Sequence, residues 1–435
     1  MKTNFRCSCR VSGLLLFVLV AVTAHAGKHK LNYMDRFSEE ERQTEPHVKS
    51  STCELPQDFV DGQWEGIIAA SDGSTYFSVS SHSPHHNAQF YRFLPEEDRV
   101  EHLINVARWC GQSDAPGKWN AQGKIHSTIY EHEKKLYMSS CAAHRTPDRP
   151  YPGGHFLRYH LETARFEDLG VDPTKEGCGL LTMLFEPKYK RMYANHPKLR
   201  YLDLKTGKHV TIGKLNEGYQ CRVLIADKYG NVYGSRINGE IWKYNPRTDE
   251  INTLEARVPS DPNLETKPNK KGTGQWINIV KDPETDWYYS VRRGDEYLFR
   301  FKPPEKPDGL KGKTEGLAPF GFRPEKADRG SLGLCLRGRT LWYCSYPIWR
   351  KQAHLMSYHI PSGKTRNHGK IICEKGRRVS EIHSLVVGAD NKLHAVAMVW
   401  SIKGEDPANP WANRAQCFFH ARFMVIDPEK DLKNQ

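Results

Sequence analysis

Residues 223–254, VLIADKYGNVYGSRINGEIWKYNPRTDEINTL, contain the pattern from which the fold can be predicted. They hold four short apolar runs, separated by turns that contain Gly, Asp, Asn and Pro. Apolar and polar residues alternate within the runs, and helical periodicity is scarce. The stretch therefore predicts four strands in the order strand, turn, strand, loop, strand, turn, strand.

The same unit occurs seven times along the chain. Its marker is a tyrosine in the second predicted strand, and successive markers are 61, 56, 40, 56, 54 and 51 residues apart: Tyr76, Tyr137, Tyr193, Tyr233, Tyr289, Tyr343 and, with histidine in the same slot, His394. A third apolar run follows each marker, at 90–93, 156–159, 199–202, 241–244, 298–301, 355–358 and 422–427. One such unit cannot bury both faces of its sheet alone, but seven stacked in a ring can. The chain is therefore predicted to be all-β, a seven-bladed β-propeller of four-stranded antiparallel blades.

The first residues predict the compartment. Lys2 and Arg6 precede the apolar run VSGLLLFVLVAV, and AHA at 24–26 offers small residues for cleavage. This pattern predicts a secretory signal peptide over 1–26, cleaved near Ala26, with an apolar run too short to span a bilayer. The mature chain is expected to be secreted or periplasmic, with no membrane anchor. Residues 27–60 are charged and aperiodic, which predicts an N-terminal extension before a propeller over 61–430.

The net charge indicates the class of ligand, and the cysteines indicate possible cross-links or a metal site. The formal net charge is +13, which for an exported protein favours an anionic polysaccharide or cell surface over nucleic acid. Export permits disulfides, and Cys53 is a candidate for holding the extension in place. Cys335 and Cys344 lie on adjacent predicted strands and are expected to form a disulfide or, with Cys417 and His420, a structural metal site.

The stretch IHSTIYEHEKKLYMSSCAAH, residues 125–144, points to a functional site. His126 precedes the inner strand of the second unit, and His144 follows its second strand. In a propeller these two points meet at one mouth of the central channel. The position eleven residues before the marker holds His126, Arg222 and His383 in three different units. These side chains are expected to share the channel mouth.

Two more units add candidates to the mouth. The fifth has a longer turn and offers Trp276, which would stack on a sugar face, and Asn278. The fourth places Tyr219 just before its inner strand and Arg236 just after its second strand. For any of these residues the alternative is a structural role, in which the side chain only hydrogen-bonds neighbouring blades.

These residue types favour one chemistry. No carboxylate pair suited to a glycosidase stands out, and no GxSxG, HExxH, P-loop or dinucleotide-binding motif is present. β-Elimination on a uronic acid needs a cation to neutralise the carboxylate, a base for the C5 proton and an acid for the leaving oxygen. Arginine, histidine and tyrosine supply these groups.

A signal peptide, seven such blades and the paired His126/His144 and Tyr219/Arg236 resemble the exported propeller lyases that cleave ulvan, a sulphated algal polysaccharide containing uronic acids. The resemblance implies that Tyr219 and His126 exchange protons while Arg236 and His144 hold the carboxylate. Arg222 is an alternative for the neutralising role. Tyr193 or His196 of the third unit is an alternative to the fourth-unit partner. This mechanism requires no cofactor, and the substrate would be an anionic polysaccharide bound by a monomer.

Two other functions remain open from the sequence. A metal-dependent propeller lyase of the oligogalacturonate type would hold a divalent cation near the channel, and His383 is a candidate ligand. A non-catalytic propeller would only bind glycans or a protein.

Overall fold

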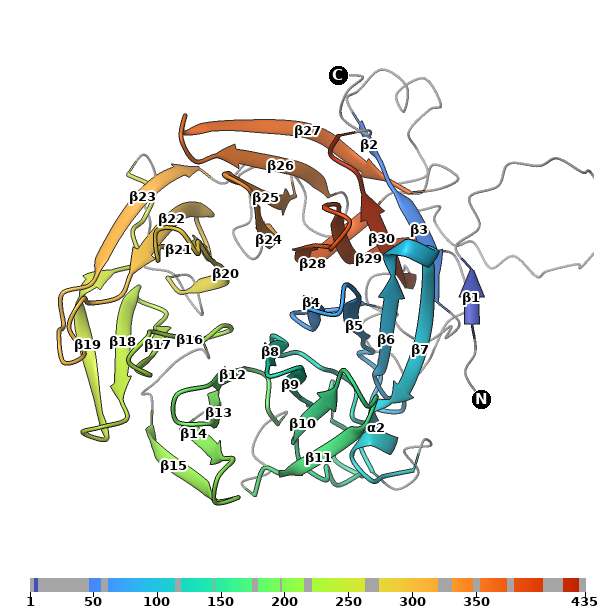
Figure 1. Cartoon of the computed structure of the whole chain (residues 1–435), viewed down its shortest axis with the longest axis horizontal. Coiled ribbons are helices and arrows are strands. Elements are labelled where there is room, and N and C mark those ends of the chain that lie inside the picture. Colours follow the sequence, from blue (N-terminus) through green and yellow to red (C-terminus); the bar gives the residue numbers. More distant parts are fainter. Residues whose placement is uncertain are drawn as a thin grey trace, which may run out of the picture.

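The computed structural model describes residues 4–6, 47–55, 62–113, 119–143, 145–173, 179–195, 198–214, 221–262, 274–319, 331–346, 353–373, 379–401 and 418–429. Seven sheets, each with a blade of four antiparallel strands, stand around a central axis, which confirms the predicted propeller (Figure 1). The innermost strands are β4, β8, β12, β16, β20, β24 and β28, one from each blade.

Each blade contributes four strands to its sheet, counted outward from the axis. Blade one comprises β4 (Ile67–Ala69), β5 (Thr75–Val79), β6 (Gln89–Leu94) and β7 (Arg99–Asn105). Blade two comprises β8 (Tyr130–His132), β9 (Lys135–Ser139), β10 (His155–His160) and β11 (Phe166–Val171). Blade three comprises β12 (Met183–Glu186), β13 (Arg191–Asn195), β14 (Lys198–Asp203) and β15 (His209–Lys214). Blade four comprises β16 (Ile225–Ala226), β17 (Val232–Ser235), β18 (Glu240–Asn245) and β19 (Glu250–Arg257). Blade five comprises β20 (Trp276–Lys281), β21 (Tyr288–Arg292), β22 (Tyr297–Lys302) and β23 (Lys313–Pro319).

Blades six and seven complete the ring. Blade six comprises β24 (Ser331–Arg337), β25 (Thr340–Ser345), β26 (His354–His359) and β27 (Lys364–Ile372). Blade seven comprises β28 (Val379–Val387), β29 (Leu393–Ser401), β30 (Phe418–Ile426) and β3 (Ser51–Glu54). Extra strands β1 (Asn4–Arg6) and β2 (His47–Lys49) flank β7 and β27, and short helices η2 (Pro95–Glu97) and α2 (Val106–Trp109) adjoin blade one. Across the described residues, no helix has the length and apolar character needed to cross a membrane.

The N-terminal extension takes part in ring closure. Strand β3 pairs antiparallel with β30, with Ser51 opposite Val425 and Glu54 opposite Arg422, and so forms the outer strand of blade seven. Strand β2 pairs parallel with β27 of blade six. Residues 47–54 therefore belong to the propeller sheets, although the sequence places them in an extension that ends at residue 60.

The marker residues occupy equivalent places in their blades. Tyr76 lies opposite Ile68 of its inner strand, and Tyr233 lies opposite Ile225. The Tyr76 hydroxyl donates to Asp72 Oδ2 at 2.8 Å, in the turn between the first two strands. His394 takes the same role in blade seven, because its Nε2 contacts Asp390 Oδ1 at 3.0 Å. The histidine in the tyrosine slot is therefore a structural substitution.

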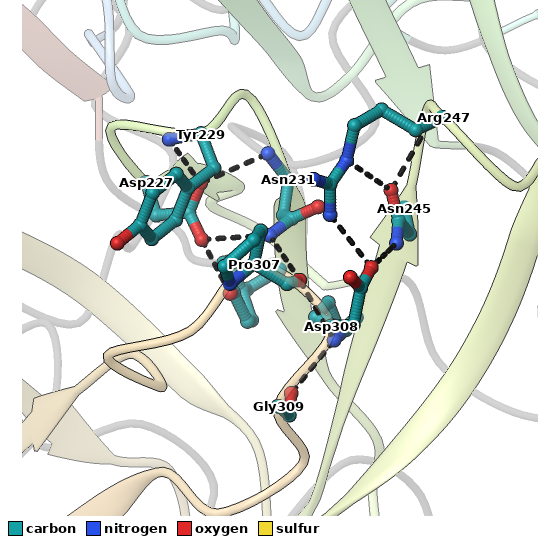
Figure 2. A network of polar contacts seen from close by, with 10 residues as sticks. Asp227, Tyr229, Asn231, Asn245, Arg247, Pro307, Asp308 and Gly309 are labelled. Atoms are coloured by element: carbon teal, nitrogen blue, oxygen red, sulfur yellow. Dashed lines mark hydrogen bonds and ion pairs between the residues drawn. The ribbon is translucent and has the colours of Figure 1, made fainter.

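A polar network joins blades four and five at the end where the inner strands finish (Figure 2). The loop between β22 and β23 lies against blade four. Asn231 Nδ2 donates to the Pro307 carbonyl at 3.0 Å. Asn245 Nδ2 and Arg247 Nη2 both donate to Asp308 Oδ1, at 2.8 and 2.6 Å. These contacts hold two neighbouring blades in fixed relation at the end opposite the candidate site.

The expected disulfide between Cys335 and Cys344 is wrong. Both residues are buried free thiols. The register explains this, since Cys335 lies opposite Trp342 and Cys344 lies opposite Leu332 on the paired strands. Cys53 of β3 is disulfide-bonded.

Candidate functional site

The segments that lead into the inner strands converge at one end of the propeller axis. There the side chains of four blades form a group that we call the axial cluster, consisting of Trp64, Glu65, Lys124, His126, Arg222 and His383. His126 stands four residues before β8 begins, and Arg222 stands three before β16. Three residues predicted from the count of eleven, His126, Arg222 and His383, are thus brought together.

Trp64 is the centre of the axial cluster. Its ring lies nearly parallel to the His126 imidazole, with centroids 6.0 Å apart and an interplanar angle of 16°. The His383 ring is 5.6 Å away on a tilted plane. Lys124 Nζ lies 3.6 Å from the indole centroid, which is a cation–π contact. The indole therefore fixes two imidazoles and one ammonium relative to one another.

His126 is held as a neutral imidazole with one ring nitrogen directed at a cation. Its Nδ1 is 3.2 Å from the Leu181 carbonyl oxygen, which can only accept, so Nδ1 carries the proton. Nε2 faces Arg222 Nη1 at 3.5 Å and keeps its lone pair. Burial, then Arg222, Lys124 and His383, lower the pKa of His126 well below its usual 6.5. At neutral pH the imidazole is therefore uncharged.

Glu65 is a buried carboxyl beside the same arginine. Burial raises the pKa of Glu65 to about 7, partly offset by the Arg222 charge and by a hydrogen bond from Ser384. Ser384 Oγ donates to Glu65 Oε2 at 3.4 Å. Oε1 has no hydrogen-bond partner among the described residues. A carboxyl poised near neutrality can give or take a proton, which is typical of catalytic groups.

His383 of the axial cluster also contacts a buried carboxyl group of its own blade. His383 Nε2 contacts Glu381 Oε1 at 2.7 Å, and both side chains are buried. Asn278 Nδ2 donates to the His383 backbone carbonyl at 3.3 Å, which links blade five to blade seven. The predicted Asn278 therefore lies beside the cluster. Its Oδ1 accepts no hydrogen bond from any described residue.

The sequence count of eleven also identifies Glu65, because this residue stands eleven before Tyr76. Asn278 likewise stands eleven before Tyr289. This position could have identified Glu65, but its residue type did not, because a single acidic residue outside any known motif indicates no particular chemistry. Trp64 and Lys124 were missed because only the structure places them over one another.

Two predicted residues have other roles. Trp276 is fully buried, donates from Nε1 to the Val223 carbonyl at 2.7 Å and packs near Phe301. Its ring has no exposed face for a sugar, so the predicted stacking role is wrong. Arg236 lies in the turn between β17 and β18, where it pairs with Glu240 at 2.9 Å. The structure does not bring Arg236 to His126.

Three other candidates cannot be placed in the site. His144, Tyr219 and His196 lie outside the described residues. Tyr193 is described, and it is a buried marker residue that packs against Tyr201 and Tyr244. Burial raises the pKa of Tyr193 above its ordinary value of 10, which suits a structural role better than proton transfer.

The described part of the chain holds no group of three or more His, Cys, Asp or Glu side chains that could bind a metal ion. His383 of the axial cluster has an acidic partner in Glu381, but the two do not belong to such a group.

Comparison with known proteins identifies the fold. No protein-family model matches the chain, and no curated protein matches it. Among solved structures, streptogramin B lyase has a TM-score of 0.53 at 9% identity, covering 87% of this chain and 97% of that one. The WD40 repeats of RRP9 give 0.51 at 10% identity, with 86% and 97% covered. A Bacteroides fragilis protein named as a 6-phosphogluconolactonase gives 0.50 at 9% identity, with 83% and 97% covered. At such identities the likeness shows the propeller fold alone.

Proposed function

We propose that this protein is an exported lyase that cleaves a uronic-acid-containing polysaccharide, of the sulphated ulvan type, by β-elimination at the axial cluster. The observation that carries the proposal is the contact of a neutral His126 with the Arg222 guanidinium beside a carboxyl of pKa about 7. A base, an acid and a carboxylate-neutralising cation are the three groups that this elimination needs.

Arg222 is proposed to bind the uronate carboxylate. With its negative charge neutralised, the C5 proton becomes more acidic and the developing enolate is stabilised. The same binding would strengthen the base. Arg222 is the second-largest cause of the lowered pKa of His126, so a carboxylate that neutralises the guanidinium raises that pKa. His126 would therefore become a better base only when substrate is present.

Proton transfer is proposed to run from C5 to His126 Nε2 and from Glu65 to the leaving oxygen. The C5–H electrons form the C4–C5 double bond, the bond between C4 and its oxygen breaks, and that oxygen takes the Glu65 proton. Arg222 then replaces Arg236 in the role that the family resemblance implies. Tyr219 and His144 remain candidates for further contacts with the substrate.

Other properties of the chain support an exported enzyme that acts on a polyanion. The net charge of +13 would attract such a polymer. The predicted signal peptide and the disulfide of Cys53 are both typical of exported proteins. The second candidate function is a non-catalytic polyanion-binding propeller, in which the buried His126 and Glu65 would have a structural role.

Product analysis tests the proposal. The mature protein is incubated with a panel of uronate polysaccharides, ulvan first, and the ultraviolet absorbance of the unsaturated uronate is followed. Elimination makes this chromophore and hydrolysis does not. Activity should fall as pH rises through about 7, because Glu65 loses its proton there. Binding without any rise in absorbance would favour the non-catalytic function.

A further inference from the structure

We propose a second binding subsite for the same anionic polysaccharide, outside the axial cluster and formed by Trp119, Arg145 and Arg149. We call these three residues the outer platform. The proposal rests on the proposed function for the nature of the polymer, but it is argued from independent contacts. The platform would hold a neighbouring part of the chain by stacking on one sugar ring and pairing with carboxylate or sulphate groups.

Trp119 is the most exposed large apolar side chain among the described residues, at 48%. Its backbone neighbourhood is nevertheless firmly held. The adjacent Asn120 is buried, and its Nδ2 donates to the carbonyls of Thr146 and Arg149 while its Oδ1 accepts from the Thr146 backbone N–H at 2.9 Å. Asn120 N also donates to the Pro150 carbonyl at 2.9 Å. An exposed indole on a fixed backbone loses little entropy when a flat ligand stacks on it.

Two arginines lie on the loop to which Asn120, the neighbour of Trp119, is hydrogen-bonded. Arg149 Nη1 donates to His85 Nδ1 at 2.7 Å, which orients the guanidinium, and its Nε lies 3.7 Å from the exposed Asp148. Arg145 is exposed and lies over the Tyr151 ring, 5.4 Å from its centroid. Guanidinium groups bind carboxylate and sulphate with two parallel hydrogen bonds. An exposed aromatic ring next to a loop that carries two arginines therefore matches a sugar that carries anionic groups.

One continuous segment links Trp119 of the outer platform to Lys124 and His126 of the axial cluster. Residues 119–126 run beside residues 81–88, with Ala121 N donating to the Pro84 carbonyl at 3.0 Å and Ser81 N to the Gly123 carbonyl at 2.9 Å. Trp119 and Lys124 are five residues apart, so their Cα atoms are separated by at most about 17 Å. Several linked sugars span that length. Arg149, Lys124 and Arg222 would then give one polymer successive cationic contacts.

The experiment measures binding separately from cleavage. The affinity of the mature chain for ulvan is determined by calorimetry, with neutral dextran as a comparison polymer. Trp119→Ala should weaken ulvan binding about tenfold, while Trp119→Phe should restore most of it. Arg149→Gln should weaken binding mainly at low salt. Leu310→Ala is the matched control, because Leu310 is the other exposed large apolar residue in the described part of the chain and lies in the β22–β23 loop at the opposite end.

The outcomes separate this inference from the proposed function. A tenfold loss for Trp119→Ala with no unsaturated product from the wild type would support the platform and refute the lyase. Equal ulvan affinity of Trp119→Ala and wild type would overturn the platform even if the enzyme is active. No wild-type binding of ulvan, or equal binding of dextran, would overturn it as well.

Discussion

Glutamine in place of Glu65 should make the stability of the fold less sensitive to pH. Burial raises the pKa of Glu65 from 4.5 to about 7. Between these values the folded protein keeps a proton on Glu65 that the unfolded chain has released. The free energy of unfolding contributed by Glu65 is therefore greatest below pH 4.5, falls as the pH rises towards 7 and is constant above it.

The size of this effect follows from the pKa. Each pKa unit corresponds to about 1.36 kcal/mol, so ionising Glu65 in the folded protein costs about 3 kcal/mol in total. Between pH 5 and pH 8 the wild type should lose about 2–3 kcal/mol that Glu65→Gln does not lose. The glutamine amide stays neutral and its oxygen can still accept the Ser384 hydroxyl, so the remaining contacts are kept.

Urea unfolding at pH 5 and pH 8 measures the difference. All other titrating groups are common to both proteins, so their contributions cancel in the comparison. Glu162→Gln is the control, because Glu162 is exposed after β10 and its replacement should leave the pH dependence unchanged. Parallel stability curves for wild type and Glu65→Gln would refute the assignment of a buried carboxyl that titrates near pH 7.

Three further predictions follow from the same contacts. Arg222→Gln should raise the pKa of His126, because the guanidinium is a cause of its lowering, and an unchanged imidazole titration by NMR would contradict this. Trp276→Ala should destabilise the fold by about 3–5 kcal/mol in urea unfolding, as expected for a buried aromatic residue, and a loss below about 1 kcal/mol would contradict a core role. Removal of residues 1–55 should lower the melting temperature, because it deletes β3 and leaves the edge of β30 unpaired, whereas removal of residues 1–46 keeps that strand.

Most of the fold can be predicted from the sequence repeat. Each marker tyrosine pairs with an inner strand in the structure, and the turn aspartates accept its hydroxyl in blades one and four. Ring closure could not be predicted in the same way. Strand β3 has no marker of its own and pairs with β30, more than 360 residues further along the chain. Residues 27–60 are charged and show no periodicity from which the pairing of β3 with β30 could be predicted.

Part of the site could be predicted, because the position of a residue relative to the marker tyrosine is enough to place its side chain near the propeller axis. The count from the marker found His126, Arg222 and His383, and the same count reaches Glu65. In blade five the same position holds Asn278, which lies beside the cluster, whereas Trp276, two residues earlier, was also selected and is buried in the core. The count could not show that Arg236 is already paired with Glu240. Side-chain partners across neighbouring strands depend on register, which the repeat does not specify.

The proposed elimination depends above all on proton transfer by His126. Its most direct test is the rate at which His126→Gln forms unsaturated uronate from ulvan, measured beside polymer binding. His132→Gln is the control, because His132 belongs to β8 of the same blade but lies beyond the axial cluster. We expect a rate at least about 100-fold below wild type for His126→Gln, with binding retained and the control fully active. Wild-type rates for His126→Gln would contradict the proposed role of this histidine.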